Sequence, residues 1–111
     1  MHMDNLNAVQ RLKQHLNQLN YDLYNIVQEA NRKKTNSNYK FEYDRYRITV
    51  ELTERNDDCT YYCITVYPKP WPDMGVHNGL SIPDNWTKGQ EWKEVADRVQ
   101  YLILTLIRFG Y

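Results

Sequence analysis

The chain lacks the charge imbalance and the long apolar runs that would direct it to nucleic acid or into a membrane. Its 14 lysine and arginine residues balance its 14 aspartate and glutamate residues, so only a local patch could attract a polyanion. No apolar run approaches the roughly 20 residues that span a bilayer. The stretch from Met1 to Asn20 is polar, unlike a signal peptide. We expect a cytoplasmic protein without membrane contact.

Cysteine is scarce, and its spacing excludes a stabilising crosslink. Cys59 and Cys63 are the only two cysteines. In a strand, residues four apart lie about 13 Å from each other, which is too far for a disulfide bond. Two free thiols fit a reducing compartment. Without a second cysteine pair or neighbouring histidines, they do not predict a zinc site either.

Motifs for catalysis and cofactor binding are missing as well. Gly75 and Gly79 lack the lysine and the serine or threonine that follow in a phosphate-binding loop. The run Asn56-Asp57-Asp58 has neither the glycine hinge nor the closing carboxylate of a calcium-binding loop. Only a spatial pairing of Cys63 with His77 would activate a nucleophile. We therefore expect a protein that is not an enzyme, with no catalytic residue, cofactor or metal ion.

What is present fits one folded domain. A chain of 111 residues has the length of one domain, and 41% hydrophobic with 25% charged residues is close to the globular average. Met1 and His2 could derive from cloning, with Met3 as the natural start. We predict a single α+β domain over residues 1–111.

The N-terminal third predicts a long amphipathic helix. From Asn5 to about Lys34 the apolar residues step by three and four, as in a helix that packs lengthwise on another helix. Such a helix is about 40 Å long and exceeds what a small sheet can cover. It would pack on the C-terminal helix, pair with a second chain, or kink near Asn20. The apolar positions are Leu6, Val9, Leu12, Leu16, Leu19, Leu23, Ile26 and Ala30.

Two segments with alternating polarity predict the strands of a β-hairpin. They run from Phe41 to Arg55 and from Cys59 to Pro68, and Asn56 to Asp58 supply the turn. Residues directly opposite each other point to the same side, so one register gives a uniformly apolar face. This register pairs Leu52 with Tyr62, Val50 with Ile64 and Ile48 with Val66 on the apolar side, and Arg47 with Tyr67, Thr49 with Thr65 and Thr53 with Tyr61 on the other.

The segment from Tyr67 to Trp86 predicts a long loop, because it holds four prolines and two tryptophans. Loops longer than about 12 to 15 residues in compact domains are usually functional or disordered. A short third strand between Met74 and Ile82 is an alternative. Trp71 and Trp86 would either anchor a partner or fold back over the core.

The C-terminal segment predicts a second helix, from Lys88 to about Phe109. Thr87 and Gln90 match a capping box, and an apolar stripe follows from Trp92 to Leu106. The last turns, with the sequence YLILTLIRF, are apolar nearly all round. They are therefore buried on more than one side or contact a second chain. We expect both helices to pack on the apolar face of the hairpin.

Tyrosine and arginine on the opposite sheet face suggest binding. Ten tyrosines are many for this length, and tyrosine, tryptophan and arginine dominate binding hot spots. We predict a protein-binding module, a small regulator or inhibitor that blocks a larger protein or complex sterically. The predicted partner-binding residues are Tyr43, Arg45, Arg47, Tyr61, Tyr67 and Trp71.

Three alternatives stay open. The same face resembles the platforms of aromatic and basic residues on which single-stranded nucleic acid stacks. The heptad pattern and the apolar C-terminal turns would also suit a homodimeric assembly protein. The tyrosines could instead stabilise an exposed sheet through cross-strand pairs.

Overall fold

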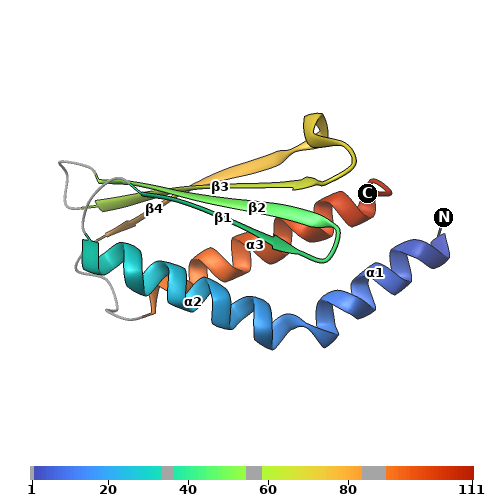
Figure 1. Cartoon of the computed structure of the whole chain (residues 1–111), viewed down its shortest axis with the longest axis horizontal. Coiled ribbons are helices and arrows are strands. Elements are labelled where there is room, and N and C mark those ends of the chain that lie inside the picture. The colour runs from blue at the N-terminus through green and yellow to red at the C-terminus, as the bar shows by residue number, and fades with distance from the viewer. Residues whose placement is uncertain (1, 34–36, 55–58, 84–89) are drawn as a thin grey trace.

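The chain folds into a four-stranded antiparallel sheet with α-helices on one of its faces. The computed structural model describes residues 2–33, 37–54, 59–83 and 90–111. Each strand pairs with the next strand along the chain, and the helices lie together on one side of the sheet (Figure 1). The predicted α+β class is confirmed. The elements are α1 (His2–Gln14), α2 (Leu16–Lys33), β1 (Ser37–Tyr43), β2 (Tyr46–Glu54), β3 (Cys59–Pro68), the short 3₁₀ helix η1 (Pro72–Met74), β4 (Val76–Pro83) and α3 (Glu91–Arg108).

The prediction of one long N-terminal helix is wrong. The structure has two helices, α1 and α2, which meet at an angle at His15 (Figure 1). The bend lies closer to the N-terminus than Asn20. Backbone hydrogen bonds continue across it, from the His15 amide to the Arg11 carbonyl and from the Leu19 amide to the His15 carbonyl, each 3.0 Å long. The bend keeps both apolar stripes on the core, where Leu12, Leu19 and Leu23 are buried.

The turn between β1 and β2 holds the end of α1. The Tyr43 hydroxyl donates hydrogen bonds to the carbonyl oxygens of Arg11, at 3.3 Å, and Leu12, at 3.5 Å. Arg11 Nε donates to the Asp44 carboxylate at 3.0 Å. The His15 ring meets the Tyr43 ring edge to face, with 6.4 Å between the centroids. These contacts fix the direction of α1 separately from that of α2, which accounts for the bend.

The predicted strand from Phe41 to Arg55 is also interrupted. A two-residue turn at Asp44 and Arg45 separates β1 from β2, so Tyr43 lies opposite Tyr46. Asp44 has a φ of 53°, in the left-handed region that aspartate tolerates better than most residues. The hairpin prediction of two strands, or three with a short one, therefore falls short of the four that the structure has.

The predicted register of β2 and β3 is confirmed at every pair. Leu52 lies opposite Tyr62, and Arg47 lies opposite Tyr67. The remaining predicted pairs are also present: Val50 with Ile64, Ile48 with Val66, Thr49 with Thr65 and Thr53 with Tyr61. Alternation along both strands was sufficient here, because a slip by one residue would have mixed apolar and polar side chains on each face.

The predicted long loop from Tyr67 to Trp86 is wrong over Val76–Pro83, which forms a strand, while residues 69–75 do connect two strands. β3 continues to Pro68, and β4 pairs with β3 from Val76 opposite Val66 to Pro83 opposite Cys59. The suggested third strand thus exists, as the edge strand β4. Proline at the end of an edge strand removes no hydrogen bond that the sheet needs. Trp86 and Thr87 lie outside the described residues.

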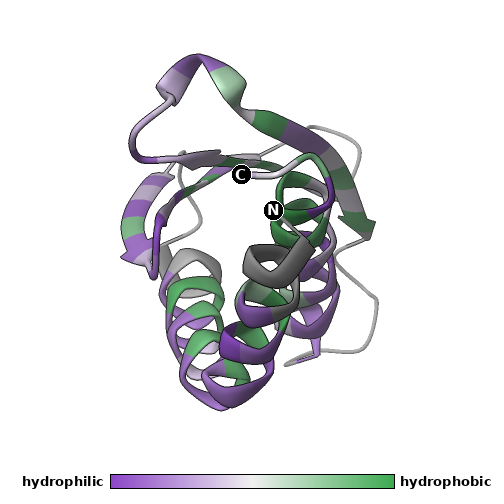
Figure 2. Ribbon diagram, turned by 90° about the vertical axis from the view of Figure 1, so that its right-hand side faces the viewer, coloured by the Kyte–Doolittle hydropathy of each residue, from purple (hydrophilic) through white to green (hydrophobic). Residues whose placement is uncertain are grey.

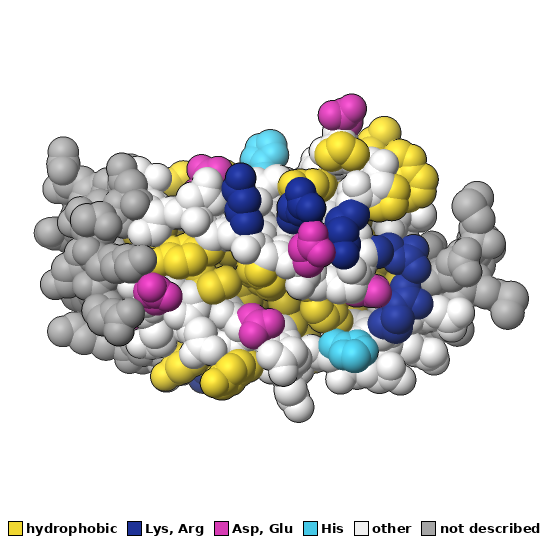
Figure 3. Space-filling view, viewed as in Figure 1, with side chains coloured by type: hydrophobic (Ala, Val, Ile, Leu, Met, Phe, Trp, Pro, Cys, Tyr) yellow, Lys and Arg dark blue, Asp and Glu magenta, His cyan; other side chains and the backbone are white. Residues whose placement is uncertain are grey.

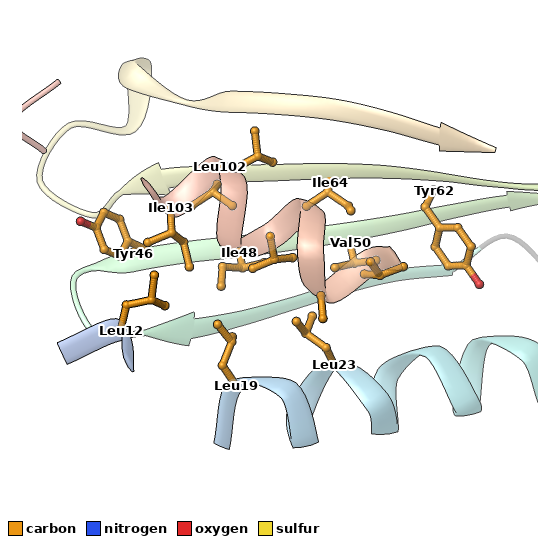
Figure 4. Packing of buried hydrophobic residues seen from close by; sticks show 14 of the residues in the cluster. Leu12, Leu19, Leu23, Tyr46, Ile48, Val50, Tyr62, Ile64, Leu102 and Ile103 are labelled. Carbon is orange, nitrogen blue, oxygen red and sulfur yellow. The ribbon is translucent and has the colours of Figure 1, made fainter. Parts of the chain in front are cut away.

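The C-terminal helix α3 begins at Glu91, a little later than predicted. The Gln90 side chain makes no capping hydrogen bond. α3 packs beneath β3 and β4 and beside α1 and α2, with an apolar side toward the sheet (Figure 2). Figure 4 shows Leu102 and Ile103 of α3 among core side chains of the sheet, with Leu19 and Leu23 of α2 across from them.

The apolar C-terminal turns divide between core and surface. Leu102, Ile103, Leu106 and Ile107 are buried, whereas Tyr101, Leu104 and Phe109 are exposed. Part of the all-round apolar character is thus explained by burial on a broad face of α3. None of the helices in the described part of the chain has the length and apolar character that crossing a lipid bilayer requires.

Two tyrosines near the β1–β2 turn give opposite predictions for stability. Tyr46 is 1% exposed, and its hydroxyl has no hydrogen-bond partner among the described residues. A buried polar group without a partner is costly, so we expect Tyr46→Phe to raise the free energy of unfolding by about 1 kcal/mol. Tyr43→Phe removes a hydroxyl that donates to α1, and should lower it by about 0.5 to 1.5 kcal/mol. Urea denaturation measures both, and an equal loss in the two variants would contradict this account.

The Tyr46 hydroxyl also predicts a loss of stability in alkali. Burial raises the pKa of Tyr46 above its ordinary value, while the unfolded chain ionises near pH 10. Above about pH 10 the unfolded chain therefore loses this proton while the folded chain keeps it, and this ionisation stabilises the unfolded state relative to the folded state. Stability is complete below about pH 10 and falls above it. This fall should be smaller in Tyr46→Phe.

Candidate functional site

Arg47 and Tyr67 form the centre of a polar cluster on the sheet face that points away from the helices. Arg47 Nη2 donates to Glu42 Oε1 at 2.9 Å, and Lys69 Nζ donates to Glu42 Oε2 at 3.1 Å. The Arg47 guanidinium carbon lies 5.9 Å from the centroid of the Tyr67 ring, and Arg47 Nη1 is 3.5 Å from the Tyr67 hydroxyl. One carboxylate thus orients two cations beside an aromatic ring.

The cluster carries an excess of positive charge. The hydrogen bond from Arg47, followed by the hydrogen bond from Lys69, lowers the pKa of Glu42. This carboxylate therefore stays ionised at a pH at which an ordinary glutamate would already be protonated. Among the described residues, neighbouring Lys40 and Arg45 make no ion pair. Figure 3 shows Lys and Arg side chains gathered around a few acidic ones. A chain without net charge therefore has a local basic patch.

An exposed aromatic surface adjoins these cations. The Lys69 amide donates to the Arg45 carbonyl at 2.9 Å, which joins the β1–β2 turn to the connection between β3 and η1. Trp71 follows in that connection and is 52% exposed. Its ring meets the Tyr111 ring edge to face at 5.5 Å, so the connection also rests on the chain after α3. Figure 1 shows η1 and the C-terminus at the same end of the molecule.

We call this surface the basic aromatic end. The connection that carries Trp71 also presents Met74, which is 45% exposed, and Phe109 beyond α3 is 70% exposed. A single binding partner could therefore contact both apolar and cationic groups. The basic aromatic end consists of Glu42, Arg45, Arg47, Tyr67, Lys69 and Trp71.

The structure brings four of the six predicted partner-binding residues together. Arg47 and Tyr67 are direct cross-strand neighbours. Arg45 lies in the turn rather than in a strand, and Trp71 lies in the connection to η1. Tyr61 is separate, because it lies toward the other end of β3, opposite Ser81.

The predicted position of Tyr43 on the outer face is wrong. It lies on the helix side, half-buried, with its hydroxyl bonded to α1. Alternation along one continuous strand would put Tyr43 and Tyr46 on opposite faces, since they are an odd number of residues apart. The two-residue turn makes them cross-strand partners instead, and cross-strand partners share a face.

The sequence did not point to Glu42 or Lys69. Glu42 belongs to β1, which was not predicted as a separate strand. Lys69 directly follows the last residue of β3. Once β1 is recognised, however, the register places Glu42 directly opposite Arg47. The signal was therefore the polar alternation in Ser37–Tyr43, SNYKFEY, which is too polar and too short to stand out alone.

The cysteines show no feature of a nucleophile or a metal site. Cys59 and Cys63 are free thiols. Burial, together with the charge of Glu51 on the neighbouring strand, raises the pKa of Cys63 and favours the neutral thiol. Within residues 2–33, 37–54, 59–83 and 90–111, no three histidine, cysteine, aspartate or glutamate side chains come together in a way that could hold a metal ion.

Comparison with protein-family models, with curated proteins and with solved structures finds no match for this chain. Its function is therefore inferred from its own geometry.

Proposed function

We propose that this chain is a non-enzymatic protein-binding module that contacts its partner through the basic aromatic end. In this proposal it acts as a small regulator or inhibitor, by occupying a site on a larger protein. The observation that carries the proposal is that exposed Arg47 and Trp71 and half-buried Tyr67 lie at one end of the sheet. These are the residue types that supply most binding energy at protein interfaces.

The ion pairs prepare this surface for binding. Glu42 holds Arg47 and Lys69 in place before a partner arrives, so less side-chain entropy is lost on association. The remaining positive charge favours a partner with carboxylates around an apolar centre, because complementary charges speed encounter and fix orientation. Trp71 would insert into that apolar centre.

Alanine variants at the basic aromatic end test the proposal. The partner is first captured from the native host and purified, and its affinity is then measured for the parent chain and for Arg47→Ala, Tyr67→Ala and Trp71→Ala. We expect each variant to bind at least about thirtyfold more weakly. Their melting temperatures should stay within about 3 °C of the parent, since surface substitutions change stability little.

The matched control is Tyr21→Ala, which removes a tyrosine that is 61% exposed on α2, a helix on the other side of the sheet from the cluster (Figure 1). It should leave the affinity unchanged. If the three variants instead melt early in proportion to their loss of binding, the rings and the guanidinium serve the stability of the sheet, and the proposed contact surface is refuted.

Binding of single-stranded nucleic acid is a second candidate function. It is favoured by the Arg47 guanidinium over the Tyr67 ring and by the cations of Lys40 and Arg45, which make no ion pair with any residue that the structure describes. Bases stack on such rings while cations contact the phosphates. Labelled single strands should then be retained at low salt and released as salt rises. Absence of retention at low salt would eliminate this candidate.

A further inference from the structure

The strand β1 lies at an open edge of the sheet. It pairs with β2 along its whole length, and in the described part of the chain no strand pairs with its other side. Alternate residues of an edge strand direct their backbone amide and carbonyl groups to the open side, where another chain can pair with them. α3 packs beneath β3 and β4, whereas α2 meets β1 through a smaller contact. The edge of β1 is therefore accessible.

Apolar side chains flank this edge on the helix side. Tyr39 and Phe41 point toward the helices, pack against the core and remain only half-buried. Figure 3 shows a band of apolar side chains between the basic patch and the helices in the lower part of the view. A strand added to β1 would place every second side chain over this band, because side chains alternate between the two faces.

Cations flank the same edge on the outer side. Lys40 is exposed and makes no ion pair within the described residues. Glu42 is already bound by Arg47 and Lys69, so it does not offset Lys40. β4, the other edge strand, has the sequence VHNGLSIP and carries no lysine, arginine, aspartate or glutamate. Only the β1 edge thus combines apolar side chains below with excess positive charge above.

We propose that β1 binds an extended peptide of alternating apolar and acidic residues as an additional strand of the sheet. The peptide backbone pairs with the open side of β1, as in other cases of strand addition. Its apolar side chains lie beside Tyr39 and Phe41, and an acidic side chain lies beside Lys40. This goes beyond the proposed function, because the contact is made by the backbone edge of β1 and by Tyr39, Lys40 and Phe41, none of which belongs to the basic aromatic end.

Charge favours such a peptide over a second copy of this chain. Two β1 edges brought together would each contribute Lys40 and the excess of cations around Glu42. The like charges would then repel. An acidic strand instead neutralises this excess.

Synthetic peptides test the proposal directly. The probe is a capped, fluorescent peptide of about nine residues that alternates glutamate and valine, since strands are usually of this length or shorter. Fluorescence anisotropy should detect binding of this peptide, but not of one that alternates lysine and valine or one that alternates glutamate and serine. A glutamate and valine peptide with N-methyl groups on alternate residues should not bind, because it cannot pair with the edge.

Variants of the full chain locate the contact. We expect Lys40→Glu to bind the glutamate and valine peptide at least about tenfold more weakly than the parent chain does, and to bind the lysine and valine peptide. The affinity of Lys40→Gln for the glutamate and valine peptide should lie between that of the parent chain and that of Lys40→Glu. His77→Glu introduces the same side chain at an exposed position of the other edge strand, β4. This variant should still bind the glutamate and valine peptide in preference to the lysine and valine peptide.

Amide exchange and sedimentation give the outcomes that would overturn the proposal. Added peptide should protect amides of β1 and not those of β4 from exchange. Protection of β4, equal binding by Lys40→Glu, or equal binding of the glutamate and serine peptide would each refute strand addition at β1. So would a concentration-dependent dimer of the chain alone in which the amides of β1 become protected from exchange, since a second copy would then be the natural occupant.

Discussion

Ile103→Ala is expected to lower the free energy of unfolding by about 2 to 5 kcal/mol. Ile103 is fully buried in α3 and lies among core side chains that include Tyr46 and Ile48 of β2 and Leu12 of α1 (Figure 4). Its removal loses the transfer free energy of the deleted carbons, and neighbours from three elements cannot all close the cavity at once. For a domain whose total stability is of the order of 5 to 15 kcal/mol, this is a large part of the whole.

The neighbouring residue in the same helix is the control. Leu104 is 39% exposed, so Leu104→Ala should cost less than about 1 kcal/mol. Both variants lose helix-compatible aliphatic residues to alanine, and they differ mainly in burial. Urea denaturation measures the difference in the free energy of unfolding between the two variants, provided that the dependence of this free energy on urea concentration is unchanged. Similar losses in the two variants would mean that α3 does not pack on the sheet through the face described here.

Gly79→Val is expected to destabilise the chain by about 1 to 3 kcal/mol, through overpacking. Gly79 lies on the outer face of β4, and the Tyr61 side chain covers it. A Cβ atom at Gly79 would overlap the hydroxyl of Tyr61 and lie 2.9 Å from its Cζ. The ring would have to move away, although valine otherwise suits a strand.

A double-mutant cycle shows whether Tyr61 is the cause. In a Tyr61→Ala background the space above Gly79 is free, and Gly79→Val should then be neutral or stabilising. The coupling between the two sites should be about 1 to 3 kcal/mol, measured by denaturation of the four chains. Equal effects of Gly79→Val in both backgrounds would show that backbone strain, and not the ring, opposes the valine.

The pairing of β2 with β3 was predictable because it depends on local alternation and on one geometric rule. Ile48, Val50, Ile64 and Val66 had to share a face, and only one register achieves this. Apolar periodicity likewise identified α3, apart from a few residues at its start. Where a pattern is strong and the constraint is short in range, the sequence is sufficient.

β1 and its turn were not predictable in the same way. Asp44 and Arg45 lack the glycine or asparagine that usually marks a two-residue turn, and no Pro or Gly interrupts the strand pattern. The chain reverses there because Arg11 pairs with Asp44 and the core accepts Tyr46. These are tertiary contacts, so a local reading placed Tyr43 on the wrong face and missed the partnership of Glu42 with Arg47.

The bend at His15 has the same explanation. The heptad pattern across it is nearly continuous, and the backbone hydrogen bonds remain. The direction of α1 is set by Tyr43 and Asp44, which come much later in the chain. Likewise, the grouping of Trp71 with Tyr111 depends on where η1 and the end of α3 meet. The residue types of the basic aromatic end were predictable, but their grouping was not.

The order of the strands has a consequence for how this protein folds. Each strand pairs with its neighbour in the chain, so hairpins can form in succession, with little entropy lost in closing each short loop. The contacts of α3 with α1 and α2 instead join the two ends of the polypeptide. Contacts between distant segments form slowly. We therefore expect docking of the terminal helices, rather than pairing of the strands, to limit the folding rate.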